Sequence, residues 1–100
     1  MNDYMLLMHR DAHNPQAAAD LERWSEYLAW LQGTGQFEGG SSIGAGLRLR
    51  KGRPDQPEDS DLSGFIRVRA SSLEEARAFL SGNPVYEAGG SVTVCELPRD

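Results

Sequence analysis

Two histidines flank an aspartate near the start of the chain, at His9, Asp11 and His13. Alternate residues of an extended segment point to the same side, so these three side chains could face one metal ion or one substrate proton. The spacing has no metal-site fingerprint, and a solvated loop after a strand is the competing interpretation. We therefore expect no metal site, keep the three residues as the alternative, and take His9 as the candidate acid–base residue.

Four arginines alternate in two later segments, as Arg48 with Arg50 and as Arg67 with Arg69. If the segments pair in a register that gathers all four on one face, a bound carboxylate or phosphate would offset their repulsion. Arg48, Arg67 and Arg69 are therefore candidate ligand-binding residues, although sequence does not fix the register. The alternative is a solvated hairpin whose arginines meet nearby acids, which are Asp55, Glu58, Asp59 and Asp61.

Aromatic residues recur along an expected helix at Trp24, Tyr27 and Trp30. They could form the wall of a ligand pocket, with Trp24 the preferred lining residue, or they could simply pack in the core. Asn83, which precedes Pro84, is a further candidate for hydrogen bonds to a ligand. Its alternative role is to end a helix, and its amide cannot act as a general base.

Length and composition limit the classes of protein. One hundred residues with a net charge of −5 predict a single domain spanning residues 1–100. The acidic balance argues against nucleic acid and anionic membranes as partners, and no apolar run is long enough for a membrane span. A single cysteine, Cys95, cannot form an internal disulfide, so a reducing cytoplasm is the expected setting. We expect no cofactor.

The strands that must position these residues follow from hydrophobic patterns. The apolar run Tyr4–Met8 predicts a central strand covered on both faces. Alternation predicts a second strand over 43–50, after a glycine-rich bend or short strand at 37–42, and a third over 62–70. The last strand is expected over 91–97. The polar segment between the middle strands is expected to be a mobile loop.

Two helices are expected between these strands. Asn14-Pro15 predicts a helix start and Gly33 its end, with an apolar stripe at Ala17, Leu21, Trp24, Leu28 and Leu31. Ser72 with Glu75 forms a capping-box pattern at the start of a second helix. The expected inner face of that helix consists of Leu73, Ala76, Phe79 and Leu80.

The resulting order β-α-β-β-α-β predicts a ferredoxin-like α+β domain. Its four-stranded antiparallel sheet would carry both helices on one face. Phe65 would lie on the opposite face, which so small a sheet cannot easily leave in contact with water. A second copy is the simplest cover for that face, so we expect a homodimer.

Four motifs in order resemble the YCII-related family, and most of all its DGPF-like branch, over nearly the whole chain. They are Tyr4-Met5-Leu6-Leu7-Met8, Gly64-Phe65-Ile66-Arg67-Val68, Ser72-Leu73-Glu74-Glu75-Ala76 and Gly89-Gly90-Ser91-Val92-Thr93-Val94. The resemblance implies a ferredoxin-like domain that pairs into a dimeric α+β barrel.

The resemblance carries over no catalytic residue. Many family members have a histidine on the first helix and an aspartate before a proline after the second helix, taken as the active site. Here Trp24 and Asn83 occupy those positions, and the Asp-Gly-Pro-Phe tetrad is absent. The sequence therefore favours a dimer that binds a small molecule, with an anion as one option. The alternatives are a small acid–base enzyme using His9 and a structural or partner-binding accessory domain.

Overall fold

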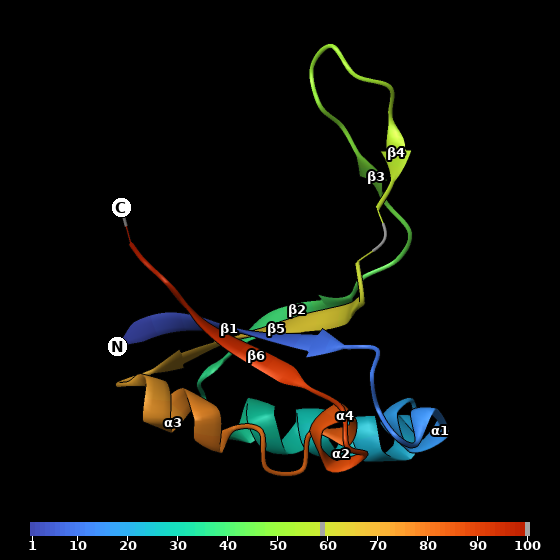
Figure 1. Cartoon of the computed structure of the whole chain (residues 1–100). Helices are drawn as coiled ribbons and strands as arrows, with labels where there is room; N and C mark the ends of the chain where they lie inside the picture. Colours follow the sequence, from blue (N-terminus) through green and yellow to red (C-terminus); the bar gives the residue numbers. More distant parts are fainter. Residues whose placement is uncertain (59, 100) are drawn as a thin grey trace.

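The computed structural model describes residues 1–58 and 60–99 and consists of a sheet with helices on one side (Figure 1). The strands are β1 (Asn2–His9), β2 (Phe37–Ser42), β3 (Leu47–Arg48), β4 (Gln56–Pro57), β5 (Leu62–Ala70) and β6 (Val92–Leu97). The helices are α1 (Pro15–Ala18), α2 (Leu21–Gly33), α3 (Leu73–Ala78) and α4 (Pro84–Glu87). In this part of the chain no helix is long and apolar enough to cross a membrane.

The main sheet has four strands in the order β2-β5-β1-β6, and every neighbouring pair is antiparallel. Strand β1 lies in the centre, where Leu6 pairs with Ile66 of β5 on one side and with Val94 of β6 on the other. The expected α+β class and ferredoxin-like sheet are confirmed. The predicted last strand is also confirmed, beginning one residue later at Val92.

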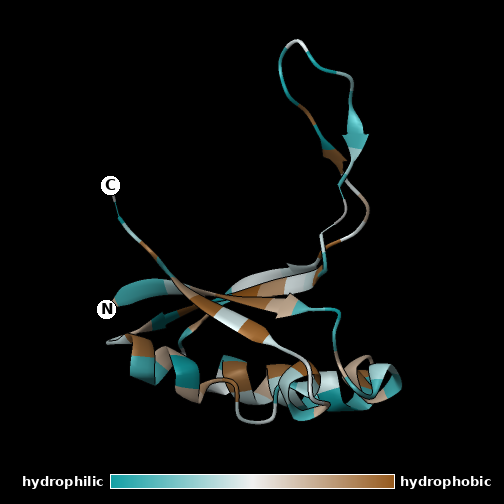
Figure 2. Cartoon of the chain, viewed as in Figure 1, coloured by the Kyte–Doolittle hydropathy of each residue, from teal (hydrophilic) through white to brown (hydrophobic). Residues whose placement is uncertain are grey.

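Alternation along β1 separates the core from the opposite side of the sheet. Tyr4, Leu6 and Met8 are buried against the helices, whereas Met5 and Leu7 between them are half-buried. We call the side away from the helices the open face. Its strand residues include Met5, Leu7, His9, Phe65, Arg67, Thr93 and Cys95. Figure 2 shows hydrophobic residues, in brown, along the strands of the main sheet and within the helices beneath it.

The first helical region is two helices, and the prediction of one long helix was wrong. The side chain of Asp20 accepts hydrogen bonds from the amides of Glu22 and Arg23, so a new helix begins at Leu21. This restart leaves Leu21 exposed and buries Tyr27 beside Leu31 instead. Leu21 was therefore wrongly assigned to the apolar stripe, whereas Trp24, Leu28 and Leu31 pack in the core as predicted.

The second helical region confirms its predicted cap and corrects its length. Ser72 accepts a hydrogen bond from the Glu75 amide at 3.1 Å, as the capping pattern predicts. Leu73 is exposed, however, so its placement on the inner face was wrong. Asn83 does more than end this region, because its side chain caps the additional helix α4 by accepting from the amides of Val85 and Tyr86.

The second strand of the main sheet lies earlier than predicted. Strand β2 at 37–42 pairs with β5, and a Cβ added to Gly40 would come within 2.4 Å of the Phe65 carbonyl oxygen. Glycine is thus required where the two backbones approach, and the pairing is irregular between Phe37 and Gly40. Only Leu47 and Arg48 of the expected strand over 43–50 are extended, and they pair with β4.

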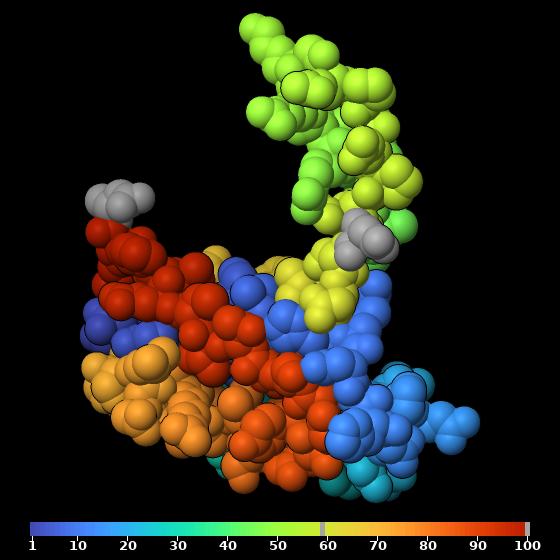
Figure 3. Space-filling model, in the orientation of Figure 1, coloured from blue at the N-terminus to red at the C-terminus, as the bar shows by residue number. Residues whose placement is uncertain are grey.

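Residues 44–58 form a hairpin, here called the arm, which projects from the sheet on the side of the open face (Figures 1 and 3). The segment expected to be a loop supplies its returning leg, including β4. Asp59 lies outside the described residues. Leu47 and Leu49 of the arm are exposed, and β3 stands out as hydrophobic in an otherwise largely hydrophilic hairpin (Figure 2).

Candidate functional site

A cavity of about 520 Å³ lies between the first half of α2 and the β2–β5 edge of the sheet. We call it the α2 cavity. Large apolar side chains that line it include Met8, Leu21, Trp24, Leu28, Phe37 and Val85. Three serines also line it, which are Ser41, Ser42 and Ser63. Among residues 1–58 and 60–99, none of those that line it is ionisable, which makes it a binding space rather than an acid–base site.

Trp24 is the largest side chain of the cavity wall. Its indole Nε1–H donates to the Ala18 carbonyl oxygen at 2.7 Å, which holds the ring between α1 and α2. Its ring meets Tyr27 edge-to-face, with centroids 5.9 Å apart. Because the only polar hydrogen of the indole already has a partner, the ring offers apolar surface to the cavity.

Two of the serines near the cavity are tied to the main chain. The Ser63 hydroxyl donates to the Met8 carbonyl oxygen at 3.3 Å, and the Ser41 hydroxyl donates to the Ser42 carbonyl oxygen. These hydroxyl oxygens keep lone pairs with which to accept hydrogen bonds. Ser41 pairs with Phe65 and so lies on the open face, whereas Ser42 pairs with Gly64 on the helix side. Ser42 is therefore the serine whose hydroxyl can contact a molecule in the cavity.

Asn83 is completely buried and lies outside this cavity. Its Oδ1 accepts from the Val85 and Tyr86 amides at 3.0 and 3.1 Å, and its Nδ2 contacts the Met8 sulfur at 3.6 Å. Since the amide is occupied within the protein, the geometry gives Asn83 a structural role in positioning α4 and Met8. Met8 is the link between Asn83 and the cavity wall.

A second cluster of polar groups lies on the open face at the end of β1. The Nδ1 atom of His9 is 3.0 Å from the Asp61 carboxylate, and its Nε2 atom is 2.8 Å from the Thr93 hydroxyl. The three residues come from the end of β1, the base of the arm and the start of β6. Both ring nitrogens are thus held by side chains that are distant in the sequence.

The structure does not bring Asp11 and His13 to His9 as a metal site. Asp11 binds the amide and hydroxyl of Ser91, and these hydrogen bonds lower the pKa of its carboxyl below the usual value. The ring of His13 instead lies against Gly89. Within residues 1–58 and 60–99, no three His, Cys, Asp or Glu side chains are grouped to hold a metal ion.

The candidate arginines are dispersed because the strand over 43–50 does not form beside β5. Arg48 lies in the arm and forms a two-bond ion pair with Glu58, the alternative that the sequence left open. Arg69 pairs with Glu38 of β2. Arg67 is exposed on the open face, and its charge, with that of Arg69, acts on Asp3. The idea of one patch of four guanidinium groups was wrong.

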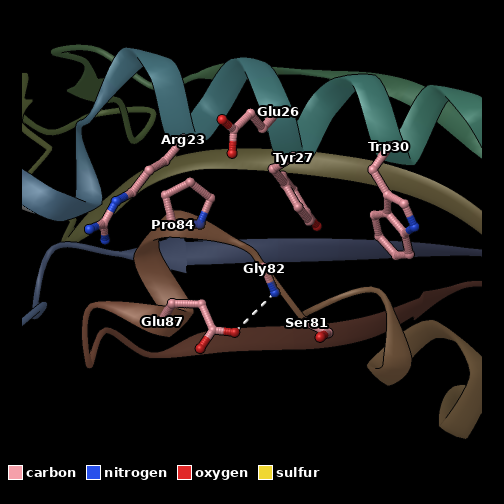
Figure 4. A pocket seen from close by; sticks show the side chains of 8 residues that line it. All are labelled: Arg23, Glu26, Tyr27, Trp30, Ser81, Gly82, Pro84 and Glu87. Carbon is pink, nitrogen blue, oxygen red and sulfur yellow. Dashed lines mark hydrogen bonds between the residues drawn. The ribbon is translucent and has the colours of Figure 1, made fainter.

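A shallower groove of about 300 Å³ runs between α2 and the segment that leads into α4. Figure 4 shows Arg23, Glu26 and Trp30 of α2 along one side, with Glu87 of α4 opposite. The Glu87 carboxylate accepts a hydrogen bond from the Gly82 amide at 2.9 Å. This contact holds the turn between α3 and α4 along one side of the groove.

Sequence reasoning missed the partners of His9 and most of the cavity wall. Asp61 was considered only as a partner for arginine, and Thr93 only as part of a motif. Period-two alternation in β6 could have placed Thr93 on the same face as Cys95, but not beside His9. The serines of the cavity were missed because β2 was expected later in the chain.

Comparisons with known proteins support the fold alone. No protein-family model matches the chain, and no curated protein matches its sequence. Among solved structures, it resembles 5-chloro-2-hydroxyhydroquinone dehydrochlorinase (TftG) from Burkholderia phenoliruptrix AC1100, in complex with 2,5-dihydroxybenzoquinone. The TM-score is 0.60 at 15% identity, and the match covers 98% of this chain and 95% of TftG. The chain thus shares the fold of a dimeric α+β barrel protein, whereas its resemblance to the YCII-related family remains a prediction.

Proposed function

We propose that this protein binds a compact, uncharged and largely apolar organic molecule, of the size of one or two aromatic rings, in the α2 cavity. The observation that carries the proposal is a space of about 520 Å³ with Trp24 in its wall and no ionisable lining residue. Ligand pockets in proteins typically combine such apolar walls with a few polar groups that fix orientation. Ser42, which pairs with Gly64 and so lies on the helix side of β2, would supply such a contact here.

An uncharged ligand fits this site better than the anion considered from sequence. Arginine does not line the cavity, and Arg48 and Arg69 are paired with acids elsewhere. The molecule bound in the TftG structure, 2,5-dihydroxybenzoquinone, is likewise a compact ring compound. That similarity supports the size class of the ligand and carries no information about a reaction of this chain.

Tryptophan fluorescence tests the proposal, because the chain has two tryptophans in different surroundings. Trp30→Phe leaves Trp24 as the only indole, and Trp24→Phe leaves Trp30, which lines the groove instead. Titration with nitrobenzene, an uncharged aromatic quencher, should saturate in the Trp30→Phe variant. The Trp24→Phe variant should show only linear collisional quenching. Equal linear quenching in both would contradict a binding site in the α2 cavity.

We also infer that a second copy of the chain covers the open face. Met5, Leu7 and Phe65 form an apolar centre on that face and are only half-buried in a single chain. Closing a second sheet over them would remove this surface from water. The open face is therefore the surface through which we expect a homodimer to form.

Sedimentation measures this association directly. Phe65→Asp should convert a dimer to a monomer at micromolar concentration, because a carboxylate would be placed in the apolar centre. Leu73→Asp is the matched control, since Leu73 is exposed on α3, away from the open face. A monomeric mass for the unaltered protein would reject the homodimer without affecting the test of the cavity.

A further inference from the structure

The geometry at the end of β1 points to a nucleophile–base–carboxylate site: we propose that Thr93, His9 and Asp61 carry out acyl transfer from a compact ester. The site is distinct from the α2 cavity, which lies on the helix side of the sheet. The observation that carries it is the continuous chain of hydrogen bonds from the Thr93 hydroxyl through both ring nitrogens of His9 to Asp61.

The chemistry of the three groups fixes the direction of these hydrogen bonds. An ionised carboxylate can only accept a hydrogen bond. In a neutral His9 ring, Nδ1 must therefore carry the hydrogen atom that it donates in the bond to Asp61. Nε2 is then the unprotonated nitrogen, and the Thr93 hydroxyl must donate to it at 2.8 Å. A hydroxyl within hydrogen-bond reach of a base, which a third group orients, is the general signature of an activated nucleophile.

The main chain holds these groups in place from two sides. The His9 amide donates to the Ser91 carbonyl oxygen at 3.0 Å, which fixes β1 against the start of β6. The next amide, that of Arg10, donates to the Asp61 carbonyl oxygen at 2.6 Å. The main-chain amides of His9 and Arg10 therefore hold the two segments that carry Thr93 and Asp61, which favours a preorganised site.

The surroundings of the array allow a substrate to approach. The His9 side chain is 21% exposed and that of Asp61 66%, and Thr93 lies on the edge strand β6. Thr93 pairs with Leu7, which supplies an apolar surface beside the hydroxyl. A small ester with an apolar or aryl group suits this corner, which lies at the edge strand β6 and borders the apolar centre at Leu7.

The proposed reaction has two balanced steps. The Thr93 oxygen attacks the ester carbonyl carbon while His9 Nε2 takes the hydroxyl proton. When the tetrahedral intermediate collapses, the bond to the leaving oxygen breaks and that oxygen receives the proton from Nε2. Water then attacks the acyl-threonine, again giving a proton to Nε2, and the carboxylic acid leaves as Thr93 regains its hydrogen. Asp61 acts as a positioning residue that stabilises the transient imidazolium.

The test uses 4-nitrophenyl acetate as the probe, with release of nitrophenolate and peptide mass spectrometry as readouts. The unaltered protein should show an acetyl group on Thr93, and Thr93→Ser should show it on the replaced hydroxyl. His9→Gln should slow acetylation by roughly 10²–10⁴-fold, the usual contribution of a general base. Thr93→Val should abolish it, whereas Leu73→Ala, at an exposed position on α3 outside both proposed sites, should leave it unchanged.

The role of Asp61 has a spectroscopic signature that a merely structural role would lack. In Asp61→Asn an amide can donate to Nδ1, so the ring proton should move to Nε2, as ¹⁵N shifts of the ring nitrogens would report. Acetylation at Thr93 should then fall even if the melting temperature is unchanged. Acetyl groups found only on Lys51 or the N-terminal amine, or a rate unaltered in a folded His9→Gln variant, would overturn the proposal.

Discussion

Two asparagines cap short helices that begin with proline, and only one of the two is buried. Replacing each by alanine measures how much burial adds to the stability that an N-cap provides. Asn14 precedes Pro15 at the start of α1, and Asn83 precedes Pro84 at the start of α4. Both side chains accept hydrogen bonds from main-chain amides of their helix. Asn14 is exposed, whereas Asn83 has no accessible surface. Burial is therefore the main difference between these two sites.

The expected costs differ for a simple reason. Loss of an N-cap costs about 1 kcal/mol, and in Asn14→Ala water can replace the lost acceptor. In Asn83→Ala the buried Val85 amide keeps no partner, which adds about 1–3 kcal/mol. The total of about 2–4 kcal/mol corresponds to a fall in melting temperature of roughly 10–25 °C for a domain of this size.

Thermal and urea unfolding, followed by circular dichroism, would measure both variants. Equal m-values would show that the two variants expose the same surface area on unfolding. The difference in midpoint then reports the difference in stability alone. If Asn83→Ala and Asn14→Ala lost the same stability within about 0.5 kcal/mol, the reasoning about the buried cap would be refuted.

Three further outcomes follow from the structure. Gly40→Ala should destabilise the β2–β5 pairing by about 1–3 kcal/mol because a Cβ there would meet a carbonyl oxygen at 2.4 Å; Gly44→Ala, with nothing within 4 Å, should be nearly neutral in the same urea titrations. The lowered pKa of Asp11 means that the folded chain binds fewer protons than the unfolded chain as the pH falls below about 5. The melting temperature should therefore drop on acidification, and less steeply in Asp11→Asn; equal slopes would count against this contribution. Arg48→Ala should cost less than about 1 kcal/mol, because its pair with Glu58 is exposed on the arm, and a larger loss would show that the arm packs against a partner.

The sequence alone was sufficient to predict those elements whose local sequence pattern agrees with their position in the fold. The alternation from Leu62 to Ala70 matches the buried and exposed residues of β5, because one side of that strand meets the helices. The Ser72 cap is likewise a local signal, since all its partners lie within three residues. Together with the central apolar strand, these signals determine the order of elements and hence the fold.

Other features depend on contacts that a linear pattern does not contain. The β2 strand is rich in glycine and serine, which have low strand propensity, and it forms because β5 accepts it at Gly40. The helix restart at Asp20 interrupts a stripe that would also suit one longer helix. The two partners of His9 lie far from it in the sequence, because Asp61 is 52 residues away and Thr93 is 84 residues away. Only the folded sheet brings them together.

The two proposed sites use neighbouring residues of one strand on opposite sides of the sheet. Met8 lines the α2 cavity, while His9 belongs to the open-face array. Because the sheet separates them, changes at the two sites should be energetically independent. In the Trp30→Phe background, His9→Gln should leave the saturable quenching of Trp24 by nitrobenzene unchanged, and saturating nitrobenzene should leave the rate of Thr93 acetylation unchanged. A coupling energy above about 0.5 kcal/mol in either assay would show that the two surfaces form one site.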